Sequence, residues 1–562
     1  MFGFTIIYNN EKNNVSQIGK SIHYLSPKTN RQIDFYYQQS TKFLNDKCFI
    51  ENNEFIVGLD GFILNLIHLK KQYNSDNTSD LFIKLYNKYG IGLLTQFKGE
   101  FSGFIFIKND EKLYCFTNQL GSKRVYYSIC DKTIIISPSI NIIAEFRNNL
   151  THKNSLNIGA AYSLLTFGGL LENQTLIENV YKLQAGNFLE INAGKLILNQ
   201  YHSFNNVETE IYNKKEAIHK LDEVFNNNIL LEYNKDKEYN YKHLATLSGG
   251  LDSRMNVMTA NKYGYNTVNF CFSQTNYLDQ QIAQQISSDL NNDFIFIPLD
   301  KSNYYKDTEE NMDIYEGQIF YLSSAHYNYA LKQLDLKNYG LIHTGQIGDG
   351  VLGGFLTDKN NPNYFSKIIS NKLFNKIPHI NLKNYSTEET FKLINRVFNV
   401  TIAGSYVSEH HESDLVSPFL DTDFIELCLS IDFSLKYKSK IYIDWINTLK
   451  PEIAKYKWEK TGFKPTSIWK SNLSRYTKKI SKTYYSSFNK QNRMSMNPYE
   501  YWYKNNTNFS ELYQNIFNES IQLIKNIELK NDVTMLFKTG NVIEKSFVIT
   551  LLLSIKKFNL IN

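Results

Sequence analysis

The alternation of apolar and polar residues divides the chain into two halves with different patterns. In the first half, short apolar runs bounded by Asn, Asp, Gly or Lys predict β-strands at residues 2–8, 55–59, 101–107, 113–117, 133–137 and 186–191. Apolar residues with helical spacing lie between them at residues 80–89 and 156–165. Strands interrupted by amphipathic helices predict a layered α/β/β/α domain.

A polar segment at residues 205–242, rich in Asn, Lys, Glu and Tyr, follows these strands. It contains one amphipathic helix, predicted at residues 215–233. A chain of 562 residues is too long for one ordinary core, because domains usually span about 100–200 residues. We therefore predict two large domains, residues 1–207 and 208–562.

The second half alternates between strand and helix patterns. Strands are predicted at residues 243–247, 267–272, 294–297 and 341–344, and helices at residues 254–263, 278–290 and 323–334. This order is typical of a doubly wound parallel sheet, in which ligands bind at the carboxyl ends of the strands. From about residue 360 the pattern becomes mainly helical.

The most informative motif is L-S-G-G-L-D-S at residues 247–253, where a predicted strand runs into a glycine turn. Two glycines allow backbone N–H groups to face one anion, and the following helix adds its N-terminal dipole. Ser248 and Ser253 can donate hydrogen bonds to phosphate oxygens, and Asp252 can hold Mg²⁺. No Lys follows the glycines, unlike in the common phosphate-binding loop. The motif predicts a pyrophosphate cradle.

A second glycine-rich turn follows the strand predicted at residues 341–344, with the sequence T-G-Q-I-G-D-G at residues 344–350. Its strand should neighbour the first, so Asp349 can meet Asp252 and share a Mg²⁺ ion. A divalent ion there would neutralise charge on a leaving pyrophosphate.

These motifs resemble those of the asparagine synthetase B family. The resemblance continues with Asp279 at a helix start, S-P-F-L-D at residues 417–421, and the lysine-bearing segment at residues 451–463. In the first half it rests on weaker motifs in the family's order, at residues 60–65, 99–102, 121–127 and 183–186. It implies an Ntn-hydrolase-like glutaminase domain followed by an ATP-pyrophosphatase domain of the adenine nucleotide α-hydrolase-like fold.

Several positions depart from the family pattern. The family's glutaminase uses a cysteine at position 2, where this sequence has Phe2, and its R-D before a glycine is replaced by Thr117 and Asn118. We therefore expect no glutamine hydrolysis, as in β-lactam synthetases and lasso-peptide cyclases. Gln346 and Gly350 replace two family acids, which puts aspartate in doubt as the substrate.

The resemblance implies that a substrate carboxylate attacks the α-phosphate of Mg·ATP, releases pyrophosphate, and is then transferred as an acyl group to ammonia. Lys460 or Lys457 is the expected catalytic lysine, and Asp252 with Asp349 the expected metal ligands. The expected ATP-binding residues are Leu247, Ser248, Gly249, Gly250, Asp252, Ser253, Phe272, Thr344 and Gly345.

Two other functions stay open. One is a ligase like β-lactam synthetase or a lasso cyclase, which joins the acyl group to a substrate amine. The other is a non-catalytic nucleotide-binding homologue, against which the intact S-G-G-L-D-S argues.

Composition limits the classes of protein and the cell compartments that fit this chain. With 42% hydrophobic and 21% charged residues and a net charge of +6, the chain is globular, and its charge does not indicate nucleic acid. Its longest apolar run, residues 548–555, is too short for a membrane span, and five scattered cysteines favour a reducing cytoplasm. We find no basic leader and allow for a homodimer.

One segment stands out by local charge. Residues 455–493 hold eleven Lys or Arg against one acid, interleaved with aromatic residues. This segment would suit an acidic sugar or a peptide carboxylate as the substrate.

Overall fold

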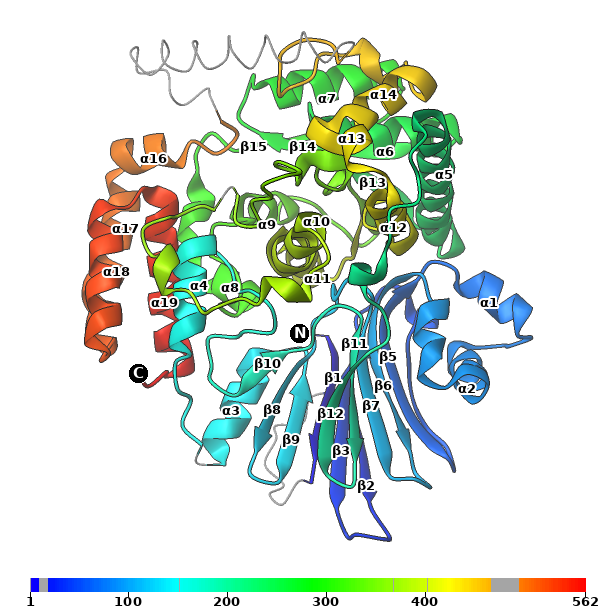
Figure 1. Ribbon diagram of the computed structural model, residues 1–562, viewed down its shortest axis with the longest axis vertical. Helices are drawn as coiled ribbons and strands as arrows, with labels where there is room; N and C mark the ends of the chain where they lie inside the picture. The colour runs from blue at the N-terminus through cyan, green and yellow to red at the C-terminus, as the bar shows by residue number, and fades with distance from the viewer. Residues whose placement is uncertain (1, 10–18, 151, 367, 402, 466–494) are drawn as a thin grey trace.

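The computed structural model describes residues 2–9, 19–150, 152–366, 368–401, 403–465 and 495–562. The N-terminal half contains two six-stranded antiparallel sheets (Figure 1). The first sheet has the order β10-β8-β9-β1-β3-β2. Its strands are β1 (Gly3–Tyr8), β2 (Lys20–Leu25), β3 (Gln32–Gln38), β8 (Tyr126–Cys130), β9 (Thr133–Ser137) and β10 (Val180–Lys182).

The second sheet has the order β12-β11-β7-β6-β5-β4. Its strands are β4 (Cys48–Glu51), β5 (Phe55–Ile63), β6 (Gly99–Ile107), β7 (Lys112–Thr117), β11 (Asn187–Asn192) and β12 (Lys195–Gln200). Alternate residues of β6 serve two cores: Phe104 packs between the sheets, and Ile105 packs against the helices outside.

Helices cover the outer faces of both sheets and complete the predicted α/β/β/α layers. On the second sheet lie α1 (Leu66–Gln72) and α2 (Thr78–Tyr89), whose Leu81 and Phe82 share a core with Phe101 of β6. On the first sheet lie α3 (Ile140–Asn149) and α4 (Ile158–Phe167).

The C-terminal half is built on a parallel sheet of order β15-β14-β13-β16-β17. Its strands are β13 (Lys242–Thr246), β14 (Thr267–Ser273), β15 (Phe294–Pro298), β16 (Tyr339–His343) and β17 (Leu415–Val416). Both faces are covered: Ala245 packs towards α5, α6 and α14, and Leu244 packs towards α8, α9 and α11. The predicted doubly wound sheet is confirmed.

The helices of this half follow the chain around the sheet. They are α5 (Lys214–Glu238), α6 (Leu251–Lys262), α7 (Leu278–Asp289), α8 (Thr308–Tyr315), α9 (Ala325–Leu331), α10 (Glu388–Lys392), α11 (Ala403–His410), α12 (Thr422–Ser430), α13 (Phe433–Lys436) and α14 (Lys440–Leu449). The proposed boundary at residue 207 lies between the end of β12 at Gln200 and the start of α5 at Lys214.

The last helices lie apart from the parallel sheet and pack against α4 of the N-terminal half and α8 of the C-terminal half (Figure 1). They are α16 (Tyr499–Asn505), α17 (Thr507–Ser520), α18 (Ile527–Thr539) and α19 (Val542–Phe558). Phe547 of α19 packs so close to Gly168, which ends α4, that a Cβ on this glycine would lie 2.7 Å from its ring. Among the described residues, no helix is both long and apolar enough to cross a bilayer.

The structure differs from the sequence predictions in the start of one helix and in several strands. Helix α6 begins at Leu251, three residues before the predicted start, so Asp252 and Ser253 belong to its first turn. An acid is stabilised there by the helix dipole. The strands of the N-terminal half that were not predicted are β2, β3, β4, β8, β10 and β12. Strand β2 is an exposed edge strand, in which Lys20, Ser21 and His23 leave only a weak apolar pattern.

Candidate functional site

The two glycine-rich turns lie side by side at the carboxyl ends of adjacent strands. Strand β13 ends at Thr246, and β16, its neighbour, ends at His343. The chain builds β14 and β15 on one side of β13 and then crosses to β16 and β17 on the other. The turns therefore meet where the winding reverses, the usual ligand position in an open parallel sheet.

The first turn is held in shape by its own side chains. Ser248 N–H donates to Ser253 Oγ (3.0 Å), and Gly250 N–H donates to Ser248 Oγ (3.2 Å). Gly249 N–H donates to Asp279 Oδ1 at the start of α7 (2.7 Å). These bonds explain the combination of serines and glycines, and they also give Asp279 a structural role in the turn.

The two predicted metal ligands come together. Asp349 N–H donates to Asp252 Oδ2 (3.1 Å), and Tyr442 of α14 donates its hydroxyl hydrogen to Asp252 Oδ1 (2.7 Å). Burial, together with the nearby charge of Asp349, raises the pKa of Asp252 to about 7. Part of this rise comes from repulsion between the two carboxylates. A cation bound between them would reduce that repulsion.

Glycine is required where the second turn crosses the first. A Cβ on Gly345 would lie 2.2 Å from the backbone carbon of Asp252, and one on Gly348 would lie 2.8 Å from Asp252 Cγ. Neither position has room for a side chain, so these glycines allow the carboxylates to approach each other.

The two candidate lysines differ in where they point. Lys460 Nζ lies 3.4 Å from Asp349 Oδ2, and its side chain is 48% exposed. The side chain of Lys457 is exposed, and its carbonyl accepts a hydrogen bond from Arg254 (2.7 Å). Geometry therefore favours Lys460 over Lys457 as the lysine that faces the carboxylate pair.

Arg254 of α6 joins the first turn to the lysine segment, a role that the sequence analysis missed. Its guanidinium is fully buried and donates to the carbonyls of Gly249 (2.8 Å) and Lys457 (2.7 Å). It also donates to the carbonyls of Ile453 (3.3 Å) and Tyr456 (3.4 Å). An arginine directly after S-G-G-L-D-S was the only signal in the sequence.

A cavity of about 410 Å³ opens between the turns. Eight of the nine expected ATP-binding residues line it, namely Leu247, Ser248, Gly250, Asp252, Ser253, Phe272, Thr344 and Gly345. Gly249 does not line it. Phe270, His326 and Tyr327 add an aromatic end that was not predicted, because α9 carries no motif.

One of the two substituted family positions lies at this cavity, and the other lies beside Phe355. Gln346 lines it, and its carbonyl accepts a hydrogen bond from Ser417 Oγ (3.0 Å). A Cβ on Gly350 would lie 2.7 Å from the ring of Phe355, so an acid at position 350 would not fit without a shift of this ring.

All five cysteines are buried. Burial raises the pKa of the Cys48 thiol to about 12 and raises that of Cys115 well above its ordinary value. A buried, protonated thiol is a poor nucleophile.

The basic and aromatic segment at residues 455–493 lies largely outside the described residues, which stop at 465 and resume at 495.

The fold and site define a two-part protein, in which layered antiparallel sheets precede a parallel sheet with a ligand cavity at its switch point. Residues 47–202 match the glutamine amidotransferase domain family, and residues 242–392 match the asparagine synthase family. The two domain matches, in this order, support a similarity of the chain to the asparagine synthetase-like proteins.

Two relatives are similar in sequence. A Methanocaldococcus jannaschii protein assigned as glutamine-hydrolyzing asparagine synthetase 2 is 24% identical over 55% of this chain and 61% of its own length. Glutamine-hydrolyzing asparagine synthetase 1 of Bacillus subtilis is 20% identical over 58% of this chain and 51% of its own length. The matches thus span between half and two thirds of these relatives.

Solved structures give only distant matches. Glutamine phosphoribosylpyrophosphate amidotransferase from B. subtilis matches with a TM-score of 0.23 and 10% identity, over 47% of this chain and 57% of its own. NMN synthetase from Francisella tularensis matches with a TM-score of 0.18 and 15% identity, over 41% of this chain and 97% of its own.

Proposed function

We propose that this protein is an ATP-dependent ligase that forms an amide bond by way of an acyl-adenylate. The observation that carries the proposal is the contact between Asp252 and Asp349 across the switch point, with Lys460 beside them. Two carboxylates and one lysine at a preformed phosphate turn match the needs of adenylyl transfer better than those of ligand binding alone.

The reaction has two steps. An oxygen of a substrate carboxylate attacks the α-phosphorus of ATP, and the bond between this phosphorus and the bridging oxygen of the β-phosphate breaks, so that pyrophosphate leaves. An amine nitrogen then attacks the acyl carbon. The acyl–phosphate oxygen bond breaks, AMP leaves, and the amine loses a proton.

The residues present suit Mg²⁺, since carboxylate oxygens are its preferred protein ligands. Asp252 and Asp349 would hold the ion, and when bound it neutralises charge on the phosphates. The raised pKa of Asp252, caused by burial and by the charge of Asp349, supports this assignment, because Lys460 offsets only part of the negative charge of the pair.

Each protein group has a part in the proposed chemistry. The turn at residues 248–253 would bind the leaving pyrophosphate through the N–H groups at the start of α6 and through its serine hydroxyls, since the N–H groups of residues 248–250 already donate to side chains. Lys460 is already placed near Asp349 and would stabilise negative charge in the transition state.

Ammonia is the proposed amine, taken up directly or delivered by another protein. The buried thiols argue against glutamine hydrolysis by this chain. A cytoplasmic location, where ATP is available, is part of the same proposal.

Pyrophosphate release tests the proposal. The full chain is incubated with ATP, Mg²⁺, a panel of carboxylates, and either ammonium chloride or glutamine. We expect carboxylate-dependent release that ammonium sustains and glutamine does not, with AMP formed in equal amount. Release of ADP and phosphate in place of AMP and pyrophosphate would refute adenylation.

A further inference from the structure

A second cavity, of about 400 Å³, lies where the chain crosses from the N-terminal half to the C-terminal half. Its walls come from the loop between α4 and β10, the turn between β10 and β11, the segment that follows β12, and residues 384, 385 and 394 on either side of α10. None of these described residues lines the cavity at the two glycine-rich turns. The second cavity is therefore a separate site, with a volume in the usual range of about 300–1,000 Å³ for small-ligand sites.

Carboxamide side chains dominate its lining. Six of the thirteen described lining residues are Asn or Gln, namely Asn173, Gln184, Asn187, Gln200, Asn205 and Asn384. Each carboxamide offers both a hydrogen-bond donor and an acceptor. The described lining contains no Lys or Arg, and Glu172 is its one acid. Such a lining suits a neutral ligand whose own groups both donate and accept.

Two polar side chains hold the walls together without a ligand. Asn205 donates from Nδ2 to the carbonyl of Asn384 (2.9 Å) and accepts from the N–H of Ser386 (3.0 Å), so it joins the two halves. Tyr385 donates its hydroxyl hydrogen to Glu172 Oε1 (3.1 Å). The acid of the lining thus already has a hydrogen-bond partner in the wall.

Asn187, at the start of β11, is the most informative lining residue. It is 6% exposed, yet its Oδ1 atom accepts no hydrogen bond from any described residue. A buried carbonyl oxygen without a donor is costly. A ligand hydroxyl in the cavity would supply the donor that the protein does not.

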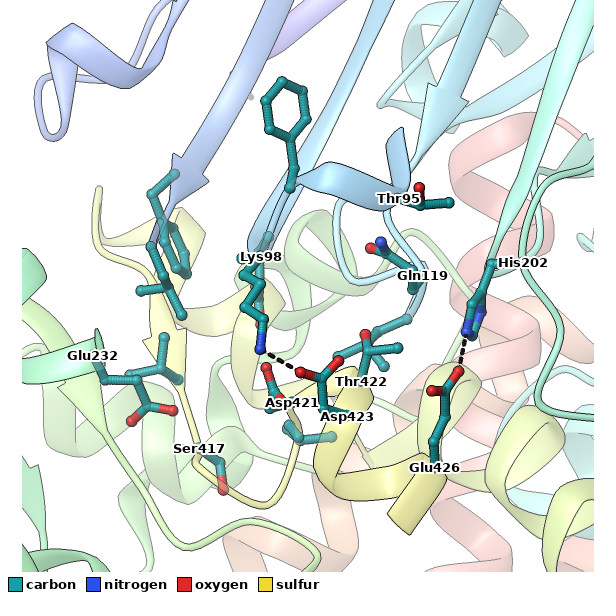
Figure 2. A pocket seen from close by; sticks show the side chains of 18 of the residues that line it. Thr95, Lys98, Gln119, His202, Glu232, Ser417, Asp421, Thr422, Asp423 and Glu426 are labelled. Carbon is teal, nitrogen blue, oxygen red and sulfur yellow. Dashed lines mark hydrogen bonds and ion pairs between the residues drawn. The ribbon is translucent and has the colours of Figure 1, made fainter. Parts of the chain in front are cut away.

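His202 shows the same deficit on the adjoining segment. Its Nε2 atom lies 2.8 Å from Oε1 of Glu426, a residue of the neighbouring cavity (Figure 2). Its Nδ1 atom is buried and has no hydrogen-bond partner among the described residues. A Cβ on Gly186 would lie 2.3 Å from the His202 carbonyl oxygen, so the segments of His202 and Asn187 pack directly against each other. Two unpartnered polar atoms therefore belong to one wall of the cavity.

We propose that this cavity binds a neutral saccharide, of one or two sugar rings, through Asn187, Gln184 and His202. Each sugar hydroxyl donates and accepts, which matches the pairing capacity of carboxamides. Ala185 and Ile394 would contact the C–H groups of the ring. An anionic sugar would find no Lys or Arg among the described lining residues. The proposal concerns binding alone, goes beyond the ligase reaction and does not depend on it.

Isothermal titration of the full chain, without ATP, tests the site. The probes are glucose, galactose, mannose, N-acetylglucosamine, maltose and lactose, with glucuronate, galacturonate and glucosamine as charged comparators. We expect saturable binding of at least one neutral saccharide, at least tenfold tighter than that of every charged comparator.

Two variants remove carboxamides from the wall with little change in side-chain size. Asn187→Leu and Gln184→Met should each weaken saccharide binding at least tenfold. Asn187→Leu should not lower the melting temperature, because its buried Oδ1 has no hydrogen bond to lose. Should it nevertheless fail to fold, Gln184→Met decides the outcome. Gln72→Met is the matched control, because Gln72 is an exposed residue of α1 outside the cavity.

The outcomes separate this site from the proposed reaction. Three results would overturn the saccharide site: no saturable binding of any neutral saccharide, tighter binding of a charged comparator, or equal binding by the two cavity variants and the unmodified protein. An equal loss of binding in Gln72→Met would also overturn it. Saccharide binding without pyrophosphate release would leave this site standing and refute the ligase reaction alone.

Discussion

Replacing Asp252 with Asn should stabilise the protein at pH 8 while it abolishes pyrophosphate release. The carboxyl pKa is about 7 in the folded protein, against an ordinary value of 3.8. The folded state therefore holds this proton more tightly than the unfolded state does. The resulting stabilisation is complete below pH 4 and is lost as the pH rises to 7, where the ionised carboxylate opposes folding.

The magnitude follows from this pKa difference. At about 1.4 kcal/mol per pH unit, ionised Asp252 costs at most about 4 kcal/mol at pH 8. Asn removes the charge and can keep both hydrogen bonds, one with Tyr442 and one with the N–H of Asp349. We expect the melting temperature to rise by roughly 2–5 °C at pH 8.

Thermal unfolding of both proteins at pH 4.5 and pH 8 measures the effect, with pyrophosphate release assayed in parallel. The gain should fall to about a quarter at the lower pH, because pH 4.5 is still slightly above the ordinary pKa of 3.8. Asp349→Asn is the matched comparison: its side chain is 52% exposed, so it should gain less stability and also lose activity. An equal gain at both pH values, or pyrophosphate release by the Asp252 variant, would refute the reasoning.

Four further predictions follow from the same site. Lys460→Ala should lower the kcat of pyrophosphate release about a hundredfold, and Lys457→Ala should lower it at most about threefold. Equal losses of kcat in the two variants would contradict this prediction. Gly345→Ala should abolish ATP binding, measured by titration, because its Cβ would lie 2.2 Å from the Asp252 backbone. The affinity for Mg·ATP should fall about tenfold from pH 8 to pH 6 as Asp252 is protonated, and a flat profile would contradict this. Glutamine should yield no glutamate, and measurable glutamate would mean that a thiol is active.

Much of the fold could be predicted because burial leaves a local pattern. Strands such as β6 and β9 are apolar runs, and the parallel arrangement of β13, β14, β15 and β16 followed from the alternation of strands and helices. Strands β2 and β12 have a weak apolar pattern because they are exposed edge strands. Strand β3 was missed although it is buried, because Asp34 interrupts its apolar run. The two-residue β17 is paired only through its contact with β16, which no local pattern records.

Some features of the site could likewise be predicted from the sequence, and others could not. The approach of Asp252 to Asp349 could be predicted, because parallel strands place both turns at one edge. The roles of Tyr442, which donates to Asp252, and of His326, which lines the cavity, could not be predicted, because each comes from a helix distant in sequence and without a motif. The choice between Lys457 and Lys460 likewise needed coordinates, since both follow the family's spacing only approximately.

The buried guanidinium of Arg254 has a mechanical consequence. The guanidinium donates hydrogen bonds to carbonyls of the phosphate turn and of residues 453–457. Moving one segment without the other would therefore leave a buried cation without some of its hydrogen-bond partners. A strain applied at one of them is transmitted to the other. Anyone who transplants this turn into another scaffold would therefore have to carry the distant segment with it.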